Sequence, residues 1–510
     1  MPQAPMLTIP FDNTYARDLP GFYARAQPAP APAPQLLFFN SALAVELGLD
    51  AAALAGAAGA AFFSGNTLPA GAEPIAQAYA GHQFGGFSPQ LGDGRALLLG
   101  ELIDRQGQRR DIAFKGSGRT PFSRGGDGRA TVGPMLREVL IGEAMHALGV
   151  PSTRALAVVA TGEKVLREAV LPGAVLTRVA ASHLRVGTFQ FFASRGERDK
   201  LGQLAGYAIN RHDPELAGLP GGDPARPLAL LQAVAQRQAR LIAQWMNLGF
   251  IHGVMNTDNM TISGETIDYG PCAFLEAYDP ATVFSSIDHG GRYAYGNQPG
   301  IARWNLARLA EALLPLMADA GDEADVQRAV AEVTAVIDAF PAWYDQALRQ
   351  GQAAKLGLPA DALAADTSLA DDWLDLLQQH GVDFTLAWRR LADAAAGDAN
   401  PLRALFGATP AAVNPWLQRW QTVCAGLDGD DSAAAADRAS RMRLANPLVI
   451  PRNHLVEAAL TAAAERGDLG PFDALLAALR RPFDDTPAQA NFAAPAPQAL
   501  TAGYRTFCGT

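Results

Sequence analysis

Apolar residues recur with helical spacing in two long stretches of the chain. In residues 227–248 one face is apolar and Gly249 follows, which predicts a helix that ends at this glycine. The second stretch has its apolar residues at Val326, Val330, Val333, Ile337 and Phe340. Because the sequence keeps this character after about Gly300, we expect the C-terminal half to be almost entirely helical.

Short apolar runs separated by glycines characterise residues 74–183. The clearest runs are residues 96–99 (ALLL), 112–114 (IAF) and 174–177 (AVLT), and they predict β-strands. A helical pattern that begins near Pro134 and ends at Gly149 interrupts them. The predicted order is strands with one helix, then a long helix followed by a polar loop, and then helices alone. This order indicates an α+β fold. The strict alternation of a doubly wound sheet is absent.

The composition describes a folded, acidic chain. Of its 510 residues 49% are hydrophobic, and 41 basic against 51 acidic residues give a net charge of −10. This balance argues against nucleic-acid or anionic-membrane binding, because phosphates require a basic face. Cys272, Cys424 and Cys508 lack metal-ligand spacing and suit a reducing cytoplasm. No apolar run is long enough for a membrane span, and residues 1–23 lack the pattern of a secretory signal.

A lysine ends one of the predicted strands. Lys115 follows the run at 112–114, and Glu138 lies in the first turns of the helix that begins near Pro134. In protein kinases a strand lysine paired with a helix glutamate holds the ATP phosphates. The alternatives are a lysine that extends to solvent and an acidic residue favoured by the helix N-terminus.

A polar loop follows the predicted helix at 227–248. The sequence 250–270 suggests a loop ending at Asn259, a tight hairpin over 260–267, and an Asp-aromatic-Gly beginning at Asp268. Kinase-like enzymes have a metal-binding Asn and Asp in these two places, and both offer hard oxygen ligands for Mg²⁺. The position of the kinase catalytic aspartate falls near Val254, which cannot accept a proton. Asp258 is the nearby carboxylate that could replace it.

Glycines and arginines surround these motifs. Gly92 and Gly94 precede the strand at 96–99, and a second glycine-rich loop contains Asp127 and Gly128. Glycines at such places let backbone N–H groups approach phosphate oxygens, although a plain turn has the same signature. Arg178 and Arg185 follow the strand at 174–177, and arginine suits bidentate phosphate contact.

Several long sequence blocks closely resemble the selenoprotein O family. These blocks are YAGHQFG at 79–85, QLGDGR at 90–95, FKGSGRTPFSR at 114–124, HGVMNTDN at 252–259, DYGP at 268–271, NP at 446–447 and PRN at 451–453. They occur in order over nearly the whole chain. The resemblance implies a protein adenylyltransferase that looks like a pseudokinase, binds ATP in a flipped orientation and moves AMP onto Ser, Thr or Tyr hydroxyls of proteins.

The resemblance also implies roles for individual residues. The nucleotide contacts would be Gly92, Gly94, Arg95, Lys115, Asp127, Gly128, Arg178, Arg185 and Asp268. Asn259 and Asp268 would hold Mg²⁺, with Mn²⁺ as an alternative, and Asp258 would accept the hydroxyl proton. Glu138 would support Lys115. The partners would be ATP and protein substrates, with redox proteins among the candidates.

The expected architecture is a bilobal, protein-kinase-like α+β fold with an all-helical C-terminal extension. We expect an N-terminal extension over residues 1–73, an N-lobe over 74–183, a C-lobe over 184–300 and the helical extension over 301–510, with residues 481–510 irregular. The family's C-terminal selenocysteine is replaced by Cys508. Its reactive position suggests a reversible disulfide between Cys272 and Cys508 that closes the tail over the site, whereas Cys424 is expected to be an inert core thiol.

Two other functions remain open at this point. One is a phosphotransferase related to aminoglycoside kinases, whose catalytic loop also begins His-Gly but continues with an aspartate where this chain has Val254. The other is a non-catalytic ATP-binding scaffold. The presence of Lys115, Glu138, Asp258, Asn259 and Asp268 together argues against an inert site.

Overall fold

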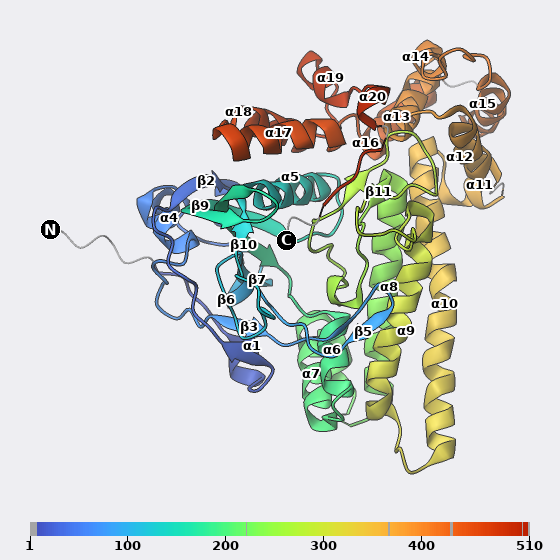
Figure 1. Cartoon of the computed structure of the whole chain (residues 1–510). Helices are drawn as coiled ribbons and strands as arrows, with labels where there is room; N and C mark the ends of the chain where they lie inside the picture. The colour runs from blue at the N-terminus through green and yellow to red at the C-terminus, as the bar shows by residue number, and fades with distance from the viewer. Residues whose placement is uncertain (1–7, 221, 366–367, 429–431, 502, 508–510) are drawn as a thin grey trace.

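An antiparallel sheet forms the first half of the molecule, and helices form most of the second half (Figure 1). This computed structural model describes residues 8–220, 222–365, 368–428, 432–501 and 503–507. The main sheet has the strand order β1-β3-β6-β7-β10-β9-β2, and β8 pairs with β10. Its strands are β1 (Tyr23–Arg25), β2 (Gln35–Phe39), β3 (Ile75–Gln77), β6 (Ala96–Ile103), β7 (Arg109–Lys115), β8 (Ala130–Thr131), β9 (Arg154–Leu166) and β10 (Val170–Ala180). The three strands expected from apolar runs are thus confirmed.

The centre of the sheet explains the environment of Lys115. Strands β6 and β10 flank β7, and Lys115 pairs with Ala96 on one side and Leu176 on the other. Both faces of β6 are buried over most of its length, which accounts for its continuous apolar run. A charged residue at the end of such a strand lies inside the protein, so it requires a partner of opposite charge.

Helix α5 (Val132–Ala147) supplies that partner. It begins two residues before Pro134, ends before Gly149, and packs on β9 and β10 with Leu136, Val139 and Leu140 buried. The helix therefore confirms the sequence pattern, and its second turn brings Glu138 to the sheet.

The predicted long helix at 227–248 is α8 (Ala225–Leu248), and Gly249 ends it with a left-handed φ of 72°. Helices α9 (Gln298–Met317) and α10 (Glu323–Leu356) pack beside α8, as Figure 1 shows. In the apolar stripe of α10, Val333 and Phe340 are buried but Val330 is 42% exposed, because the neighbouring Ala329 faces the core instead.

The C-terminal helices return to the sheet. Helices α17 (Asn453–Arg466) and α18 (Gly470–Leu479) pack against α5, and one hydrophobic core continues from the sheet through α5, α8 and α9 to these helices. A second core is built around Trp373, Trp388, Trp416 and Trp420 in the helices after α10. The chain thus forms a mixed α/β fold with a helical C-terminal region.

The remaining elements are short or belong to the periphery. They are helices α1 (Thr14–Asp18), α2 (Ser41–Glu46), α3 (Ala51–Leu54), α4 (Ala57–Phe63), α6 (Val186–Ala193), α7 (Arg198–His212), α11 (Ala360–Ala365), α12 (Ser368–His380), α13 (Phe384–Ala395), α14 (Asn400–Ala404), α15 (Asn414–Asp428), α16 (Ser432–Ala445), α19 (Pro487–Ala493) and α20 (Gln498–Thr501), and strands β4 (Gly81–Gln83), β5 (Gly86–Ser88), β11 (Phe250–Ile251) and β12 (Ala273–Phe274). In the described part of the chain, none of the helices combines the length and hydropathy needed to cross a membrane.

Two expectations from the sequence were wrong in detail. Residues 260–267 do not form a hairpin, because Thr261 bridges Arg185 and Thr266 bridges Ser152, which lie far away in the chain. Residues 481–510 are only partly irregular, since α19 and α20 lie within them. In the first case long-range bridges replaced the local strand pairing.

Candidate functional site

A single large cleft collects the residues that the sequence motifs indicated. It has a volume of about 1220 Å³ and is lined by strand ends of the sheet, α5, the loop 250–271, α17 and the tail at 504–507. The predicted site residues among its lining are Gly92, Gly94, Arg95, Lys115, Asp127, Gly128, Glu138, Arg178, Arg185, Asp258, Asn259 and Asp268. Their convergence from six segments of the chain makes this cleft the candidate active site.

Asp268 is the centre of a group of buried charges. Lys115 Nζ donates to Asp268 Oδ1 at 2.6 Å and also to Glu138 Oε1. Arg178 Nη1 donates to the same Asp268 oxygen at 2.6 Å, and Arg185 Nη1 lies 3.4 Å from Asp268 Oδ2. Burial alone would raise the pKa of Asp268, but these three cations hold it well below its ordinary value. Asp268 therefore remains ionised and fixes the cations on one wall.

The backbone at Asp268 has a conformation that few side chains adopt. Its φ is +62°, and Gly270 N donates to its carbonyl oxygen at 2.8 Å. Aspartate tolerates this left-handed region better than most residues, and the surrounding ion pairs compensate for the strain. The kinked backbone directs the carboxylate at Lys115 and Arg178.

Asp258 lies in the 3-10 turn Thr257–Asn259 at the end of the polar loop. Its Oδ2 accepts a hydrogen bond from Gln83 Nε2 at 3.2 Å, whereas its Oδ1 is buried without a hydrogen-bond partner. Burial raises the pKa of Asp258 to about 6, although the Arg185 guanidinium opposes the shift. At neutral pH the carboxylate form prevails, and one of its oxygens remains available.

The hairpin of β4 and β5 holds this turn in place. His82 N donates to Thr257 Oγ1 at 2.7 Å, and Phe84 N donates to Asn256 Oδ1 at 3.1 Å. A Cβ atom on Gly81 would lie 2.7 Å from Asp258 Oδ1, so this position requires glycine. The sequence analysis did not predict the contact of Gln83 with Asp258. Gln83 lies in the family-like block 79–85, but its residue type did not indicate contact with a carboxylate.

Asn259 and Val254 complete the loop. Asn259 Nδ2 donates to Val254 O at 3.0 Å, which assigns the amide nitrogen to the protein and leaves the carbonyl oxygen for another partner. Val254 is buried, as expected for an apolar residue where kinases have their base. Among the described residues, no group of three His, Cys, Asp or Glu side chains has metal-binding geometry.

The glycine-rich turn at 90–95 lies against the 114–124 segment. Gly92 has a φ of +78°, and a Cβ atom there would lie 2.3 Å from the Phe122 ring. Thr120 Oγ1 donates to Asp93 O at 2.6 Å, and this bond joins the 90–95 turn to the 114–124 segment. The glycines therefore permit a close approach of two backbone segments at the mouth of the cleft.

Asp127 and Arg185 have partners that the sequence did not suggest. Both oxygens of Asp127 accept hydrogen bonds from Arg167, at 2.8 and 3.0 Å, and this interaction lowers the pKa of Asp127. Arg185 donates to the backbone oxygen of Asp258 at 2.9 Å and stacks over the Tyr79 ring at 4.6 Å. Its Nε atom is buried without a partner. Arg185 thus links the Asp258 turn to Asp268.

Cys272 and Cys424 do not line the cleft. Cys272 and Cys424 are buried free thiols, and burial raises the pKa of each to about 11. Cys424 is in α15, as expected for a core thiol. Cys508 lies outside the described residues, and so does its pairing with Cys272. The described part of the tail lies close to Cys272, since Thr506 Oγ1 donates at 2.6 Å to the carbonyl oxygen of the preceding residue, Pro271.

The cleft contains buried cations next to glycine-rich turns, together with carboxylate and amide oxygens. This combination is typical of the sites of phosphate-transferring enzymes. The sequence profile of the family described as "Protein adenylyltransferase SelO" matches residues 5–480. Similar proteins carry the name "Protein nucleotidyltransferase YdiU". That of Chromobacterium violaceum is 60% identical over 492 residues, which cover 96% of this chain and all of the relative. That of Cereibacter sphaeroides strain KD131 is 59% identical, and that of Mycobacterium sp. strain KMS is 56% identical. Each match covers 99% of this chain and all of the relative. The chain belongs to the SelO family of protein adenylyltransferases.

Proposed function

We propose that the protein transfers AMP from ATP to the hydroxyl groups of Ser, Thr or Tyr side chains in target proteins. The target oxygen forms a bond to the α-phosphorus, the bond between the α-phosphorus and the bridging oxygen breaks, and pyrophosphate leaves. The observation that carries this proposal is the cleft itself. Lys115, Arg178 and Arg185 line one wall of it around Asp268, and Asp258 adds a carboxylate oxygen without a partner.

The cationic wall would bind the phosphates. In a flipped orientation of ATP, Lys115, Arg178 and Arg185 hold the β- and γ-phosphates and stabilise the departing pyrophosphate. Gly92, Gly94, Arg95, Asp127 and Gly128 line the cleft nearby and contact the rest of the nucleotide. Glu138 keeps the Lys115 ammonium in position through its ion pair.

The oxygen donors of the cleft fit a divalent cation. Asp268 and Asn259 offer hard oxygen ligands, and the buried Asp258 Oδ1 next to them has no donor to satisfy it. Asn259 and Asp268 would hold Mg²⁺ or Mn²⁺. When bound, the ion would neutralise charge on the phosphates. Without it, the chain itself still orients the nucleotide through its three cations.

Asp258 would act as the general base. Its carboxylate accepts the proton of the target hydroxyl as the oxygen approaches the α-phosphorus, and a pKa of about 6 suits a base that works near neutral pH. Gln83 and the backbone contact from Arg185 hold the turn, so the free oxygen keeps its direction. Val254 cannot perform this role, which separates the site from that of a typical kinase.

The same hypothesis includes a protein-kinase-like arrangement of lobes. Residues 74–183 would form the N-lobe, 184–300 the C-lobe and 301–510 the helical extension, with residues 1–73 preceding them. The Lys115–Glu138 pair between β7 and α5 supports this interpretation. Strands β1 and β2 from the first segment join the main sheet, so that segment would serve the N-lobe.

A disulfide between Cys272 and Cys508 remains part of the hypothesis. The contact of Thr506 with Pro271 brings the tail near Cys272, and closure would cover the cleft mouth. Because Cys272 is buried with a raised pKa, the bond would need local opening to form. Peptide mapping without reductant after mild oxidation tests for the pair.

Two labelled nucleotides test the reaction. The protein is incubated with candidate targets and ATP labelled at either the α- or the γ-phosphate, with the Asp258→Asn variant as control. Label on protein from the α-position alone, lost in the variant, supports adenylyl transfer. Label from the γ-position alone would favour the phosphotransferase. ATP binding without transfer to any target would favour the scaffold.

A further inference from the structure

Arg178 is held from two directions. Its Nη1 donates to Asp268, while its Nε lies 3.3 Å from Nε2 of His183, and the side chain is only 3% exposed. In the part of the chain that the structure describes, Arg178 Nη2 makes no hydrogen bond. The protein therefore binds the guanidinium at Nε and Nη1, on either side of Nη2, and Nη2 is left for a ligand.

The hydrogen bonds of His183 define its tautomer. Its Nδ1 lies 2.9 Å from Asp111 Oδ2, and a carboxylate can only accept, so Nδ1 carries the hydrogen. The neutral ring then has a lone pair on Nε2, which accepts the hydrogen of Arg178 Nε. Burial lowers the pKa of His183, and the nearby Arg178 and Arg185 lower it further. The neutral ring is thus the form that this environment favours.

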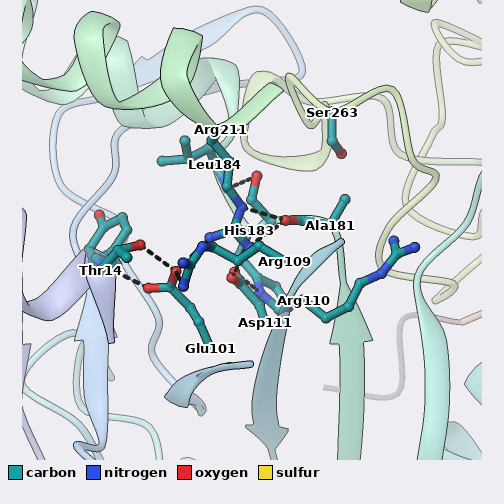
Figure 2. Close-up of polar contacts among 12 residues, drawn as sticks. Thr14, Glu101, Arg109, Arg110, Asp111, Ala181, His183, Leu184, Arg211 and Ser263 are labelled. Atoms are coloured by element: carbon teal, nitrogen blue, oxygen red, sulfur yellow. Dashed lines mark hydrogen bonds and ion pairs between the residues drawn. The ribbon is translucent and has the colours of Figure 1, made fainter. Parts of the chain in front are cut away.

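Asp111 is fixed in turn by Arg211 from α7. Arg211 Nη2 donates to Asp111 Oδ1 at 2.6 Å, and Nη1 donates to Glu101 Oε2 at 2.6 Å (Figure 2). Asp111 and Glu101 are direct cross-strand neighbours on β7 and β6, so two carboxylates meet there and require the arginine between them. The backbone of His183 also donates to Asp111, at 2.9 Å.

None of these supporting groups is part of the cleft. Asp111, His183 and Glu101 are buried and the Arg211 side chain is 4% exposed, and none of them lines the cleft, whereas Arg178 does. A purely structural ion cluster needs no contact with Arg178, because Arg211 and Arg109 already balance the two carboxylates. His183 is the connection between this cluster and the site.

We propose that Asp111 and His183 are positioning residues: they set the histidine tautomer and the orientation of Arg178, so that its free Nη2 meets a phosphate of ATP. This inference rests on the proposed function only in that Arg178 contacts the nucleotide. No proton is transferred, and the pair acts through geometry.

Two substitutions of His183 separate its two hydrogen bonds. In His183→Gln the amide lies near the position of Nε2 and can still accept from Arg178. In His183→Asn the amide lies near the position of Nδ1 and keeps only the bond to Asp111. We expect His183→Asn to weaken ATP binding and raise KM by about tenfold, as for the loss of a hydrogen bond to a charged group. We expect His183→Gln to remain within about threefold of wild type.

A double-mutant cycle with Arg178→Met supplies the decisive comparison. If His183 acts through Arg178, then His183→Asn has no further effect on the ATP dissociation constant in the Arg178→Met background. Asp111→Asn, which favours the opposite tautomer, should behave like His183→Asn in both backgrounds. Thermal melting verifies that each variant is folded, and calorimetry measures the binding.

The possible results of these experiments lead to different conclusions about His183 and Asp111. Equal losses for His183→Asn and His183→Gln, or a loss that persists in the Arg178→Met background, would overturn the positioning role. If either His183 variant fails to fold, the Asp111→Asn cycle decides on the same criterion. Normal ATP binding without transfer by wild type would refute the proposed function but leave this test intact, because its readout is binding. A wild-type chain that binds no ATP would refute both.

Discussion

The arginines of the cleft and Arg452 in the helical region are equally buried but differ in how completely they are bonded. Arg452 precedes α17 and is 0% exposed. Its Nη1 donates to Glu276 at 2.7 Å and to Asp383 at 2.6 Å, and Nε and Nη2 donate to Ala493 O at 3.2 and 2.9 Å. Every nitrogen of this guanidinium has a partner within the protein.

In the cleft the bonding is incomplete. Lys115, Arg178 and Arg185 share the carboxylate of Asp268, Arg185 Nε is buried without a partner, and Arg178 Nη2 makes no hydrogen bond to described residues. The difference indicates that a saturated buried cation holds the fold together, whereas an unsaturated group of cations is prepared for an anionic ligand.

Removing the shared carboxylate should have the largest effect. We expect Asp268→Asn to reduce transfer by about 1000-fold, because the cations lose their common anchor and the proposed metal site loses a ligand. The melting temperature should fall as well, since three cations then face one another. Transfer assays and thermal melting measure the two effects. Glu465→Gln, an exposed carboxylate on the same cleft, is the matched control and should stay near wild type. Wild-type labelling by Asp268→Asn would remove Asp268 from the site.

The opposite pattern is expected at the saturated arginine. Arg452→Met leaves the Glu276 and Asp383 carboxylates buried without their cation, so the free energy of unfolding should fall by about 3 kcal/mol. ATP binding by the folded fraction should be unchanged. Denaturant unfolding and calorimetry measure these quantities, with Arg466→Met on the exposed side of α17 as control. A loss of ATP affinity without a loss of stability would contradict the comparison.

Asp258 should separate turnover from binding. We expect Asp258→Asn to lower turnover by about 100-fold while the ATP dissociation constant changes by less than about threefold, as for a base that does not hold the nucleotide. Steady-state kinetics and calorimetry provide both numbers. A collapse of affinity with normal turnover per bound ATP would instead make Asp258 a metal ligand.

Lys355 is a third kind of buried cation, and replacing it should have the smallest effect of the substitutions considered. It lies 4.9 Å from the Trp388 ring and 5.8 Å from the Phe384 ring, and the described residues offer it no carboxylate within ion-pair distance. Burial lowers the pKa of Lys355 to about 7. Because the unfolded chain binds this proton up to a higher pH, stability should rise as pH increases from about 7 to about 10.5.

Replacing this lysine tests the expected rise of stability with pH. Lys355→Met should raise the melting temperature by about 2 °C at pH 7. The advantage over wild type should disappear above about pH 10.5, where the Lys355 side chain is neutral in both the folded and the unfolded state. Transfer activity should not change. Melting curves at several pH values measure this difference in melting temperature. The variant Lys164→Met, at an exposed lysine, is the control. A difference that is constant across pH would show that the Lys355 charge has no part in it.

Local patterns predicted the elements that depend on neighbouring residues. Helix α8 ends at Gly249 and strand β7 ends at Lys115, because helix periodicity, capping and short apolar runs are properties of adjacent positions. The same locality explains the failure at 260–267. A turn with Gly264 favours a hairpin, but Thr261 and Thr266 found partners that no local signal reveals.

For the site, the sequence determined which residue types were present, and motif resemblance selected the ones that line the cleft. Only the tertiary structure decided how they are bonded. Asp127 pairs with Arg167, Gln83 holds Asp258, and Asp111 holds His183, each across a long separation in the chain. Hydrogen bonds and ion pairs depend on distances of a few ångströms between side chains brought together by the packing of distant elements. A linear pattern contains no record of those distances.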